Sequence, residues 1–277
     1  ALARYKDRYP SLKIVARMHG YDLFNERRND GRQPFKEFID TKLDRVFFAS
    51  EYGMKYYLQH FRVTQDGRHV LSRLGTVDTR VGLPYERSGV LNLVSCSNMV
   101  NIKRVKLIVD ALERIHSFPV FWQHFGGGTE FEETLGYAEH KLSDKRNISF
   151  LFRGALPNAE VLCYYESMIV DCFITTSSTE GGNPVSIMEA LSFGIPIIAT
   201  SVGGITEMLI DTENILLPPN PSIEEVADAL DNLWSRSLES LTGLRERNRL
   251  LWQNCFTAEK NYRTFVALLS EINRNDS

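Results

Sequence analysis

The chain has 277 residues, 43% hydrophobic and 24% charged, which is typical of about two globular domains and excludes a disordered or fibrous protein. No apolar run approaches the ~18 residues that a membrane-spanning helix needs, and no signal-peptide pattern opens the chain. The formal net charge is −3, but residues 1–86 carry 16 basic and 11 acidic side chains, so this first part is suited to an anionic membrane surface or an acidic acceptor, or is a solvated surface without a partner.

The first part of the chain contains two apolar segments and one amphipathic segment. These predict strands at residues 12–20 and 44–50 and a helix at residues 51–61. No hydrophobic period survives in residues 64–90, which five glycine and proline residues interrupt. We therefore place a linker there, and divide the chain into a first domain with its linker over residues 1–86 and a second domain over residues 87–277.

From residue 91 onward, apolar segments alternate with segments of helical period. The predicted strands cover residues 91–97, 119–125, 147–154, 169–177, 195–202 and 213–219. The predicted helices cover residues 102–116, 129–142, 158–168, 184–194 and 204–210, and two or three more fill residues 222–272. Apolar strands that alternate with helices are typical of a parallel sheet covered on both faces. The sequence therefore predicts an α/β fold with a doubly wound, Rossmann-like domain, which binds ligands beyond the carboxyl ends of its strands.

Four cysteines show no paired spacing, and they are Cys96, Cys163, Cys172 and Cys255. We interpret them as buried, reduced thiols of a cytosolic protein rather than as disulfides. No Cys-x-x-Cys or His-x-x-x-His cluster is present in the sequence, so no metal site is expected.

Two loops that follow predicted strands have features of anion sites. Gly126-Gly127-Gly128 precedes a helix that Thr129 and Glu132 are predicted to open with a capping box, and glycines let the backbone approach a ligand closely. A ligand-free steric turn has the same sequence. In the other loop, Lys103 and Arg104 open a helix, where cations oppose the helix dipole. The two side chains either bind an anion that lies over that loop, or they are a pair of solvent-exposed cations without a ligand.

The segment Thr179–Gly194, TEGGNPVSIMEALSFG, has the strongest pattern. Asn183 is a good N-cap and Pro184 a good first helical residue, so a helix start with free backbone N–H groups faces the Gly181-Gly182 turn. Within the apolar helix, Glu189 needs hydrogen-bond donors, because an unpaired buried carboxylate costs several kcal/mol. Either a protein group or the two hydroxyls of a nucleotide sugar would supply them.

This combination, followed by GIPIIATSVGGITEML, resembles the donor-nucleotide domain of GT-B glycosyltransferases. More narrowly, it resembles the retaining "glycosyl transferases group 1" type, a family 4-like group that includes bacterial polysaccharide and lipopolysaccharide enzymes. The resemblance covers about residues 91–272, and a weaker one covers residues 1–86. It implies a GT-B fold in which a partial second Rossmann-like domain precedes the donor domain, with the C-terminal helices packing back on the first part.

The resemblance also implies roles for individual residues. Glu180 would contact the donor sugar, Glu189 would bind the ribose hydroxyls, and Lys103 would grip the diphosphate. In the turn before the helix, which ends at Pro184, the backbone amides would face the sugar and the diphosphate. These are the amides of Gly181, Gly182 and Asn183. The Gly-rich and base-contacting loops of the family fall at Gly126, Gly127 and Arg153.

Two features depart from the family pattern. The arginine that usually accompanies the lysine is Asn98 here, so Arg104 substitutes for it or one phosphate contact is lost. Eight residues separate Glu180 and Glu189, where the family usually has seven. Either the turn bulges by one residue or Glu180 is shifted from its usual role.

The segment ARMHGYDLF resembles the end of the acceptor domain of this family, where His19 would contact the donor sugar or its leaving phosphate. A histidine after a strand is alternatively structural. Since the chain lacks an initiator Met and only some 86 residues precede the donor domain, we expect the first half of the acceptor domain to be absent and the chain to be truncated and inactive in that form.

The expected function is transfer of a sugar, with retention, from a UDP-, GDP- or ADP-type nucleotide sugar to a glycan or lipid-linked acceptor in cell-surface polysaccharide or lipopolysaccharide synthesis. No cofactor, metal or nucleic acid is expected. The expected location is the cytoplasm, with peripheral contact to the inner membrane left open. The alternatives are a catalytically silent nucleotide-sugar binding fragment and a nucleotide-sugar epimerase of the same fold.

Overall fold

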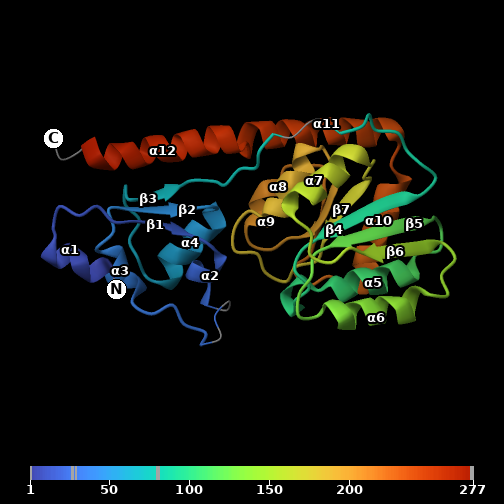
Figure 1. Ribbon diagram of the computed structural model, residues 1–277, viewed down its shortest axis with the longest axis horizontal. Coiled ribbons are helices and arrows are strands. Elements are labelled where there is room, and N and C mark those ends of the chain that lie inside the picture. Colours follow the sequence, from blue (N-terminus) through green and yellow to red (C-terminus); the bar gives the residue numbers. More distant parts are fainter. Residues whose placement is uncertain (1, 26–27, 29, 79–81, 275–277) are drawn as a thin grey trace.

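The computed structural model describes residues 2–25, 28, 30–78 and 82–274, and it shows two α/β parts that lie side by side (Figure 1). The first part holds a three-stranded parallel sheet in the order β1-β2-β3. Its strands are β1 (Val15–Met18), β2 (Arg45–Phe48) and β3 (His69–Leu71). Its helices are η1 (Leu2–Arg4), α1 (Tyr5–Arg8), α2 (Gly20–Leu23), α3 (Lys36–Asp40) and α4 (Glu51–His60).

The second part holds a six-stranded parallel sheet in the order β6-β5-β4-β7-β8-β9. Its strands are β4 (Leu91–Cys96), β5 (Val120–Phe125), β6 (Ile148–Phe152), β7 (Cys172–Thr175), β8 (Ile197–Thr200) and β9 (Ile215–Leu217). Counted along this part, the order is 3-2-1-4-5-6, which is the order of doubly wound dinucleotide-binding sheets. The predicted α/β, Rossmann-like fold is confirmed.

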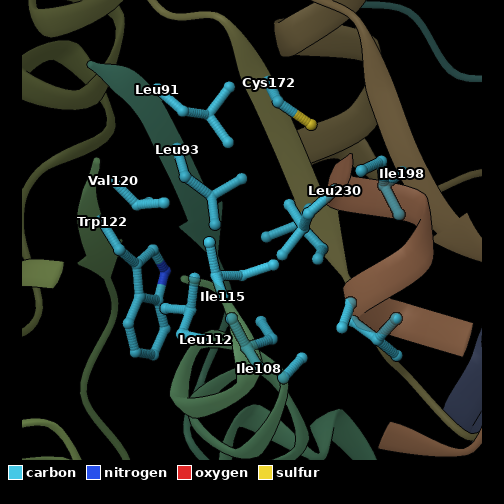
Figure 2. Packing of buried hydrophobic residues seen from close by; sticks show 14 of the residues in the cluster. Leu91, Leu93, Ile108, Leu112, Ile115, Val120, Trp122, Cys172, Ile198 and Leu230 are labelled. Carbon is cyan, nitrogen blue, oxygen red and sulfur yellow. The ribbon is translucent and has the colours of Figure 1, made fainter. Parts of the chain in front are cut away.

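Helices cover both faces of the second sheet. They are η3 (Asn101–Lys103), α5 (Val105–Arg114), α6 (Phe131–Leu142), α7 (Asn158–Ser167), α8 (Val185–Ser192), α9 (Gly204–Leu209), α10 (Ile223–Ser235) and α11 (Leu238–Cys255). Figure 2 shows one face, where Leu93, Trp122 and Cys172 of the strands pack against Leu112 of α5 and Leu230 of α10. The opposite face packs against α7, α8, α9 and α11. This double cover explains why the strands read as continuously apolar.

The last helix, α12 (Ala258–Arg274), returns to the first sheet. Its Phe265 packs edge-on against Phe47 of β2, with ring centroids 4.9 Å apart, and the Arg17 guanidinium lies 4.5 Å from the centre of the Phe265 ring. Figure 1 shows α12 running alongside the first part, next to the strands. The C-terminal segment therefore contributes to the core of the part that begins the chain.

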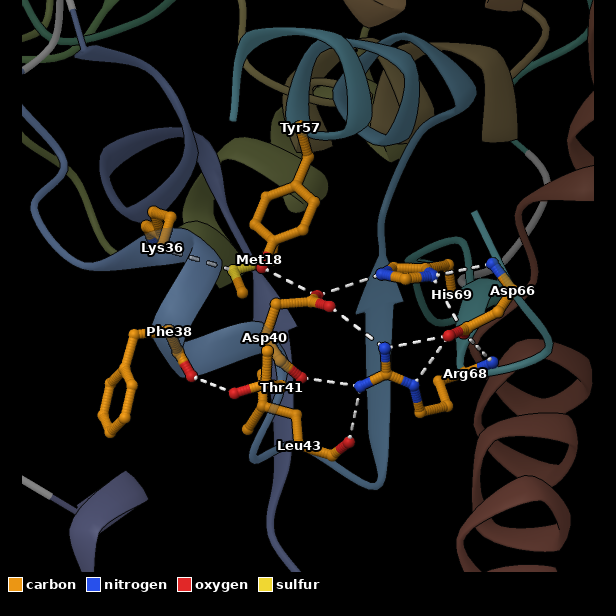
Figure 3. A network of polar contacts seen from close by, with 10 residues as sticks. All are labelled: Met18, Lys36, Phe38, Asp40, Thr41, Leu43, Tyr57, Asp66, Arg68 and His69. Carbon is orange, nitrogen blue, oxygen red and sulfur yellow. Dashed lines mark hydrogen bonds and ion pairs between the residues drawn. The ribbon is translucent and has the colours of Figure 1, made fainter. Parts of the chain in front are cut away.

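A polar network lies at the starts of strands β2 and β3 of the first sheet (Figure 3). The carboxylate of Asp40, which is 3% exposed, accepts hydrogen bonds from Tyr57 at 3.0 Å, His69 at 3.0 Å and Arg68 at 3.1 Å. Arg68 also donates to the Leu43 carbonyl oxygen. These bonds tie β3 to the preceding elements, and they satisfy a carboxylate that would otherwise be costly to bury.

Three local predictions are wrong. Strand β3 lies inside the segment that we interpreted as linker, because a three-residue strand with a buried histidine leaves no hydrophobic period; residues 79–81 of that segment lie outside the described part of the chain. Helix α6 begins after Glu130 and has no side-chain cap, so the capping box at Thr129 does not form. Cys163 is exposed on α7, whereas we expected a buried thiol.

Candidate functional site

The two central strands β4 and β7 are neighbours, and the strand order reverses between them. Lys103 closes the loop after β4, and Glu180 lies in the loop after β7. Their side chains form an ion pair across this point. The Ser178 N–H also donates to the Ile102 carbonyl oxygen at 2.7 Å, which joins the two loops through their backbones. The structure thus brings these predicted residues together where doubly wound sheets bind ligands.

The backbone of Glu180 is fixed by its contact with Gly203. Gly203 has φ 54° and ψ −137°, a conformation open almost only to glycine. A Cβ atom at Gly203 would lie 1.6 Å from the Glu180 carbonyl oxygen. Glu180 is itself largely buried, with 8% of the residue exposed. The glycine therefore lets the start of α9 come close enough to hold the Glu180 loop in place.

Gly181 forms one of the contacts between the two parts of the molecule. A Cβ atom there would lie 2.4 Å from the Gly20 Cα and 2.8 Å from the Phe24 ring. His19, which precedes Gly20, is exposed and extended at the N-cap of α2. The structure thus places the His19 segment against the loop that carries Glu180, although the two residues are far apart in the sequence.

Helix α8 begins one residue later than predicted. Pro184 occupies the N-cap position and Val185 is the first helical residue, so Asn183 does not cap the helix. Asn183 is 4% exposed, and its side-chain amide has no hydrogen-bond partner among the described residues. Gly182 lies near Ala49 of the first part, since its missing Cβ would be 3.6 Å from the Ala49 Cβ.

Glu189, in the middle of α8, is 6% exposed, and its Oε1 accepts a hydrogen bond of 2.8 Å from the Asn158 side-chain amide. Burial raises the pKa of the Glu189 carboxyl, and the Asn158 hydrogen bond partly opposes that rise. Sequence analysis left two kinds of hydrogen-bond donor open for Glu189, a protein group or the hydroxyls of a nucleotide sugar. The structure shows a protein donor, the amide of Asn158. A single neutral amide leaves most of the accepting capacity of the carboxylate unused.

A pocket of about 240 Å³ lies at the carboxyl ends of β4, β5 and β6. It is lined by Cys96, Ser97, Asn98, Phe125, Gly126, Gly127, Ala155, Leu156 and Val161. Asn98, Gly126 and Gly127 were predicted to bind the donor. Four larger cavities lie away from these loops, and their size alone does not make them candidate sites. The two largest of the four, of about 730 and 640 Å³, lie along the linker and α11–α12.

His124 of β5 holds one of the residues that line this pocket, Ser97. It is fully buried, its Nε2 donates to the Ser97 carbonyl oxygen at 3.0 Å, and its Nδ1 accepts from Ser95 at 2.8 Å. Burial lowers the pKa of His124 to about 4, so the ring is neutral. A Cβ atom at Gly126 would lie 1.9 Å from the same Ser97 oxygen, so the loop after β4 packs directly on that glycine.

Arg104 was expected to bind phosphate, but its guanidinium binds protein acceptors. Its guanidinium donates to the carbonyl oxygens of Thr176, Ser177 and Pro219 and to the Asn220 side chain, at 2.6 to 3.1 Å. These acceptors occupy the guanidinium and tie the loop after β7 to the end of β9. The structure therefore gives Arg104 a role in holding the loops, and we do not carry it into the set of ligand contacts.

Arg153 is exposed just beyond β6, and its Nε donates to the Gln123 side chain at 2.9 Å. It lies next to Ala155 and Leu156, which line the pocket. Sequence analysis missed three residues that shape the site, namely Asn158, His124 and Gly203. Only Gly203 left a signal, in the paired glycines of SVGGITEML. The other two act through contacts between elements that are remote in the sequence.

Comparisons with known proteins concern the family and the fold of this chain. The family described as "Glycosyl transferases group 1" matches residues 87–250. An uncharacterized glycosyltransferase of Haemophilus influenzae is 31% identical over 126 residues, which are 45% of this chain and 33% of that protein. A Bacillus subtilis protein, TuaC, provisionally named as a teichuronic acid biosynthesis glycosyltransferase, is 26% identical over 151 residues, or 54% and 34% of the two chains. The chain thus spans about a third of the length of these curated relatives.

Solved structures share the fold over nearly the whole chain. HepE of Anabaena, solved in complex with UDP, has a TM-score of 0.77 at 14% identity and covers 97% of this chain and 75% of that one. A glycosyltransferase of Rickettsia africae has a TM-score of 0.74 at 17% identity and covers 99% and 80%. The expected GT-B fold is thereby confirmed.

Two searches of the described residues gave negative results. No helix among them has both the length and the apolar character that crossing a membrane requires. No group of three or more His, Cys, Asp or Glu side chains in the described ranges is arranged to hold a metal ion. The expectation that activity needs no metal stays a prediction.

Proposed function

Since the chain belongs to the Glycosyl transferases group 1 family, we propose that it binds a nucleotide-diphosphate sugar and transfers the sugar to a hydroxyl acceptor with retention of configuration. The observation that carries this proposal is the Lys103–Glu180 ion pair at the strand-order reversal, beside the buried Glu189. HepE, which shares the fold, has been solved in complex with UDP-glucose. The described site offers matching positions for each part of such a donor.

In this proposal the nucleotide lies along the carboxyl ends of the strands. The base enters the pocket that Gly126 and Gly127 line, beside Arg153, and the ribose hydroxyls donate to Glu189. The diphosphate lies at the start of α8, where free backbone N–H groups favour an anion. The sugar then extends toward Glu180, the segment of His19, and the amides of the turn before Pro184.

The negative charge that develops on the leaving diphosphate is the main electrostatic demand of the reaction. Lys103 meets it with its ammonium group, and the N-terminus of α8 meets it with its dipole. The ion pair with Glu180 holds Lys103 at the site. When the diphosphate binds, it competes for Lys103, which leaves the Glu180 carboxylate available to the sugar.

Titration calorimetry with UDP, GDP and ADP tests the binding half of the proposal. We expect one of them to bind, Glu189→Ala to weaken that binding strongly, and Glu180→Ala to reduce turnover more than binding. Nucleotide affinity unchanged by Glu189→Ala would refute the ribose assignment. Turnover has to be assayed on the whole protein, because this chain spans about a third of its curated relatives. Binding without turnover there would identify a nucleotide-sugar binding module instead.

For the acceptor we propose a glycan or a lipid-linked hydroxyl compound of cell-surface polysaccharide synthesis, reached at the cytoplasmic face of the membrane. The beginning of the chain supports this, because Tyr5 and Tyr9 are about half exposed next to the exposed basic residues Arg4 and Arg8. Aromatic and basic side chains together favour the interface of an anionic bilayer. Co-sedimentation with vesicles of anionic and of neutral lipid, at low and high salt, tests this contact. Equal binding to both vesicle types would refute it.

A further inference from the structure

Asn158 is the first residue of α7, and its side chain is not used to cap that helix. The helix follows Pro157, and the Asn158 amide instead crosses to α8, where it donates to Glu189 Oε1 at 2.8 Å. The contact joins two helices on the same face of the sheet, beside the pocket that Val161 of α7 lines. It therefore determines how the Glu189 side chain is aimed.

The charge of Glu189 depends heavily on this one contact. Among the described residues, Asn158 is the sole hydrogen-bond donor to the Glu189 carboxylate, and no cation pairs with it. Its titratable neighbours are Cys96 of β4 and Tyr165 of α7. Both stay protonated, because burial raises the pKa of the Cys96 thiol to about 12 and raises that of the Tyr165 hydroxyl as well. A buried carboxylate with so little support is easily neutralised.

We infer that Asn158 is a positioning residue, whose amide holds Glu189 Oε1 in the orientation in which the carboxylate accepts the vicinal hydroxyls of a ribonucleotide. This rests on the proposed role of Glu189. It goes further by naming the ligand class that the pair selects, a ribo- rather than a 2′-deoxyribonucleotide. An ionised acceptor gains roughly 1.5–3 kcal/mol from a hydrogen bond, so loss of one ribose hydroxyl costs about tenfold or more in affinity.

The experiment measures the affinity of whichever nucleoside diphosphate binds best, and of its 2′-deoxy counterpart, between pH 5 and pH 8.5. The ratio of the two affinities cancels titration of the diphosphate, which both ligands share. In the wild type we expect a preference for the ribonucleotide that disappears as falling pH neutralises Glu189. In Asn158→Ala the carboxyl loses its donor, so the preference disappears at a higher pH than in the wild type.

Further variants separate positioning from folding. Asn158→Asp places a second carboxylate against Glu189 and should abolish the preference over most of this pH range, whereas Asn158→Gln, which retains the amide, should restore part of it. Asn232→Ala removes an exposed asparagine from α10 and is the matched control. Thermal melting shows that each variant is folded, and Asn158→Ser replaces the alanine variant if that one is not.

The outcomes distinguish this inference from the proposed function. If Glu189→Gln abolishes the ribose preference while Asn158→Ala retains the wild-type ratio and midpoint, the inference is overturned and the ribose role of Glu189 stands. If Glu189→Gln and the wild type show the same ratio, the ribose role fails and the inference fails with it. A shifted midpoint in Asn158→Ala, with Asn232→Ala unchanged, supports the inference.

Discussion

The substitution Gly203→Ala tests whether the position of Glu180 is set by the close approach of the α9 start. The new Cβ would lie 1.6 Å from the Glu180 carbonyl oxygen. Because such carbon–oxygen pairs rarely approach closer than about 3.3 Å, one of the two segments has to move by roughly 1.7 Å. The backbone conformation of Gly203 adds strain of about 1–3 kcal/mol for alanine, and overpacking adds about 1–3 kcal/mol more.

These magnitudes predict a folded but destabilised protein with a misplaced Glu180. A misplacement of about 1 Å at a reacting group costs about 100-fold in turnover. Nucleotide affinity depends on Glu189 and the base pocket in our proposal, so it should change by less than about threefold, well under one tenfold step of 1.4 kcal/mol. The assays are chemical denaturation, calorimetric titration with the nucleoside diphosphate, and turnover of the nucleotide sugar by the whole protein.

The matched control is Gly136→Ala in the exposed middle of α6, where a Cβ atom meets nothing within 4 Å. It should stabilise the protein by about 0.5–1 kcal/mol, because glycine is unfavourable inside a helix. Wild-type stability and turnover in Gly203→Ala would refute the reasoning. Equal losses of nucleotide affinity and turnover would show that the whole site, rather than Glu180 alone, depends on Gly203.

Three further changes test other parts of the site. Lys103→Ala should weaken binding of the nucleoside diphosphate about tenfold and leave the nucleoside unaffected, which calorimetry with both ligands measures; equal effects on both would contradict a phosphate contact. Burial lowers the pKa of His124 to about 4, below the ~6.5 of an unfolded chain, so its contribution to stability is complete above pH 6.5 and is lost as pH falls. Between pH 7.5 and pH 5 this loss is about 2 kcal/mol, and in urea unfolding His124→Asn should show a correspondingly smaller pH dependence; an unchanged slope would contradict a neutral buried ring. Gly181→Ala should push the loop after β7 away from α2 and lower the free energy of unfolding, because its Cβ would lie 2.4 Å from the Gly20 Cα; wild-type stability in urea unfolding would count against that contact.

The sequence predicted the second sheet well because its strands are mainly apolar and alternate with segments of helical period. This alternation indicated a parallel, doubly wound sheet, and the pattern around Glu180 placed that residue in a loop that follows a strand. Strand β3 was missed because three residues, one of them the buried His69, carry too short a signal. Such short strands are recognised only through their pairing partners.

The residues that tune the site were beyond sequence analysis for a different reason. Asn158 and Glu189 are 31 residues apart in the sequence, and the pattern of neither helix alone predicts the contact between them. Arg104 was predicted to bind phosphate because cations are unfavourable at a helix start. In the structure it is engaged by carbonyl oxygens from two other loops. Local rules identify a charge that needs a partner, but only the tertiary fold decides which partner it finds.

The two passages of the chain between the parts meet at one place. Thr76 of the first passage forms a parallel bridge with Thr257 of the second, and the Trp252 indole donates to the Thr76 hydroxyl at 2.7 Å. The two parts are also joined away from this point, because the Tyr52 N–H of α4 donates to the Glu207 carboxylate of α9 at 2.9 Å. A movement of one part against the other would have to break that bond, so the double connection and the α4–α9 bond together keep the His19 segment near Glu180.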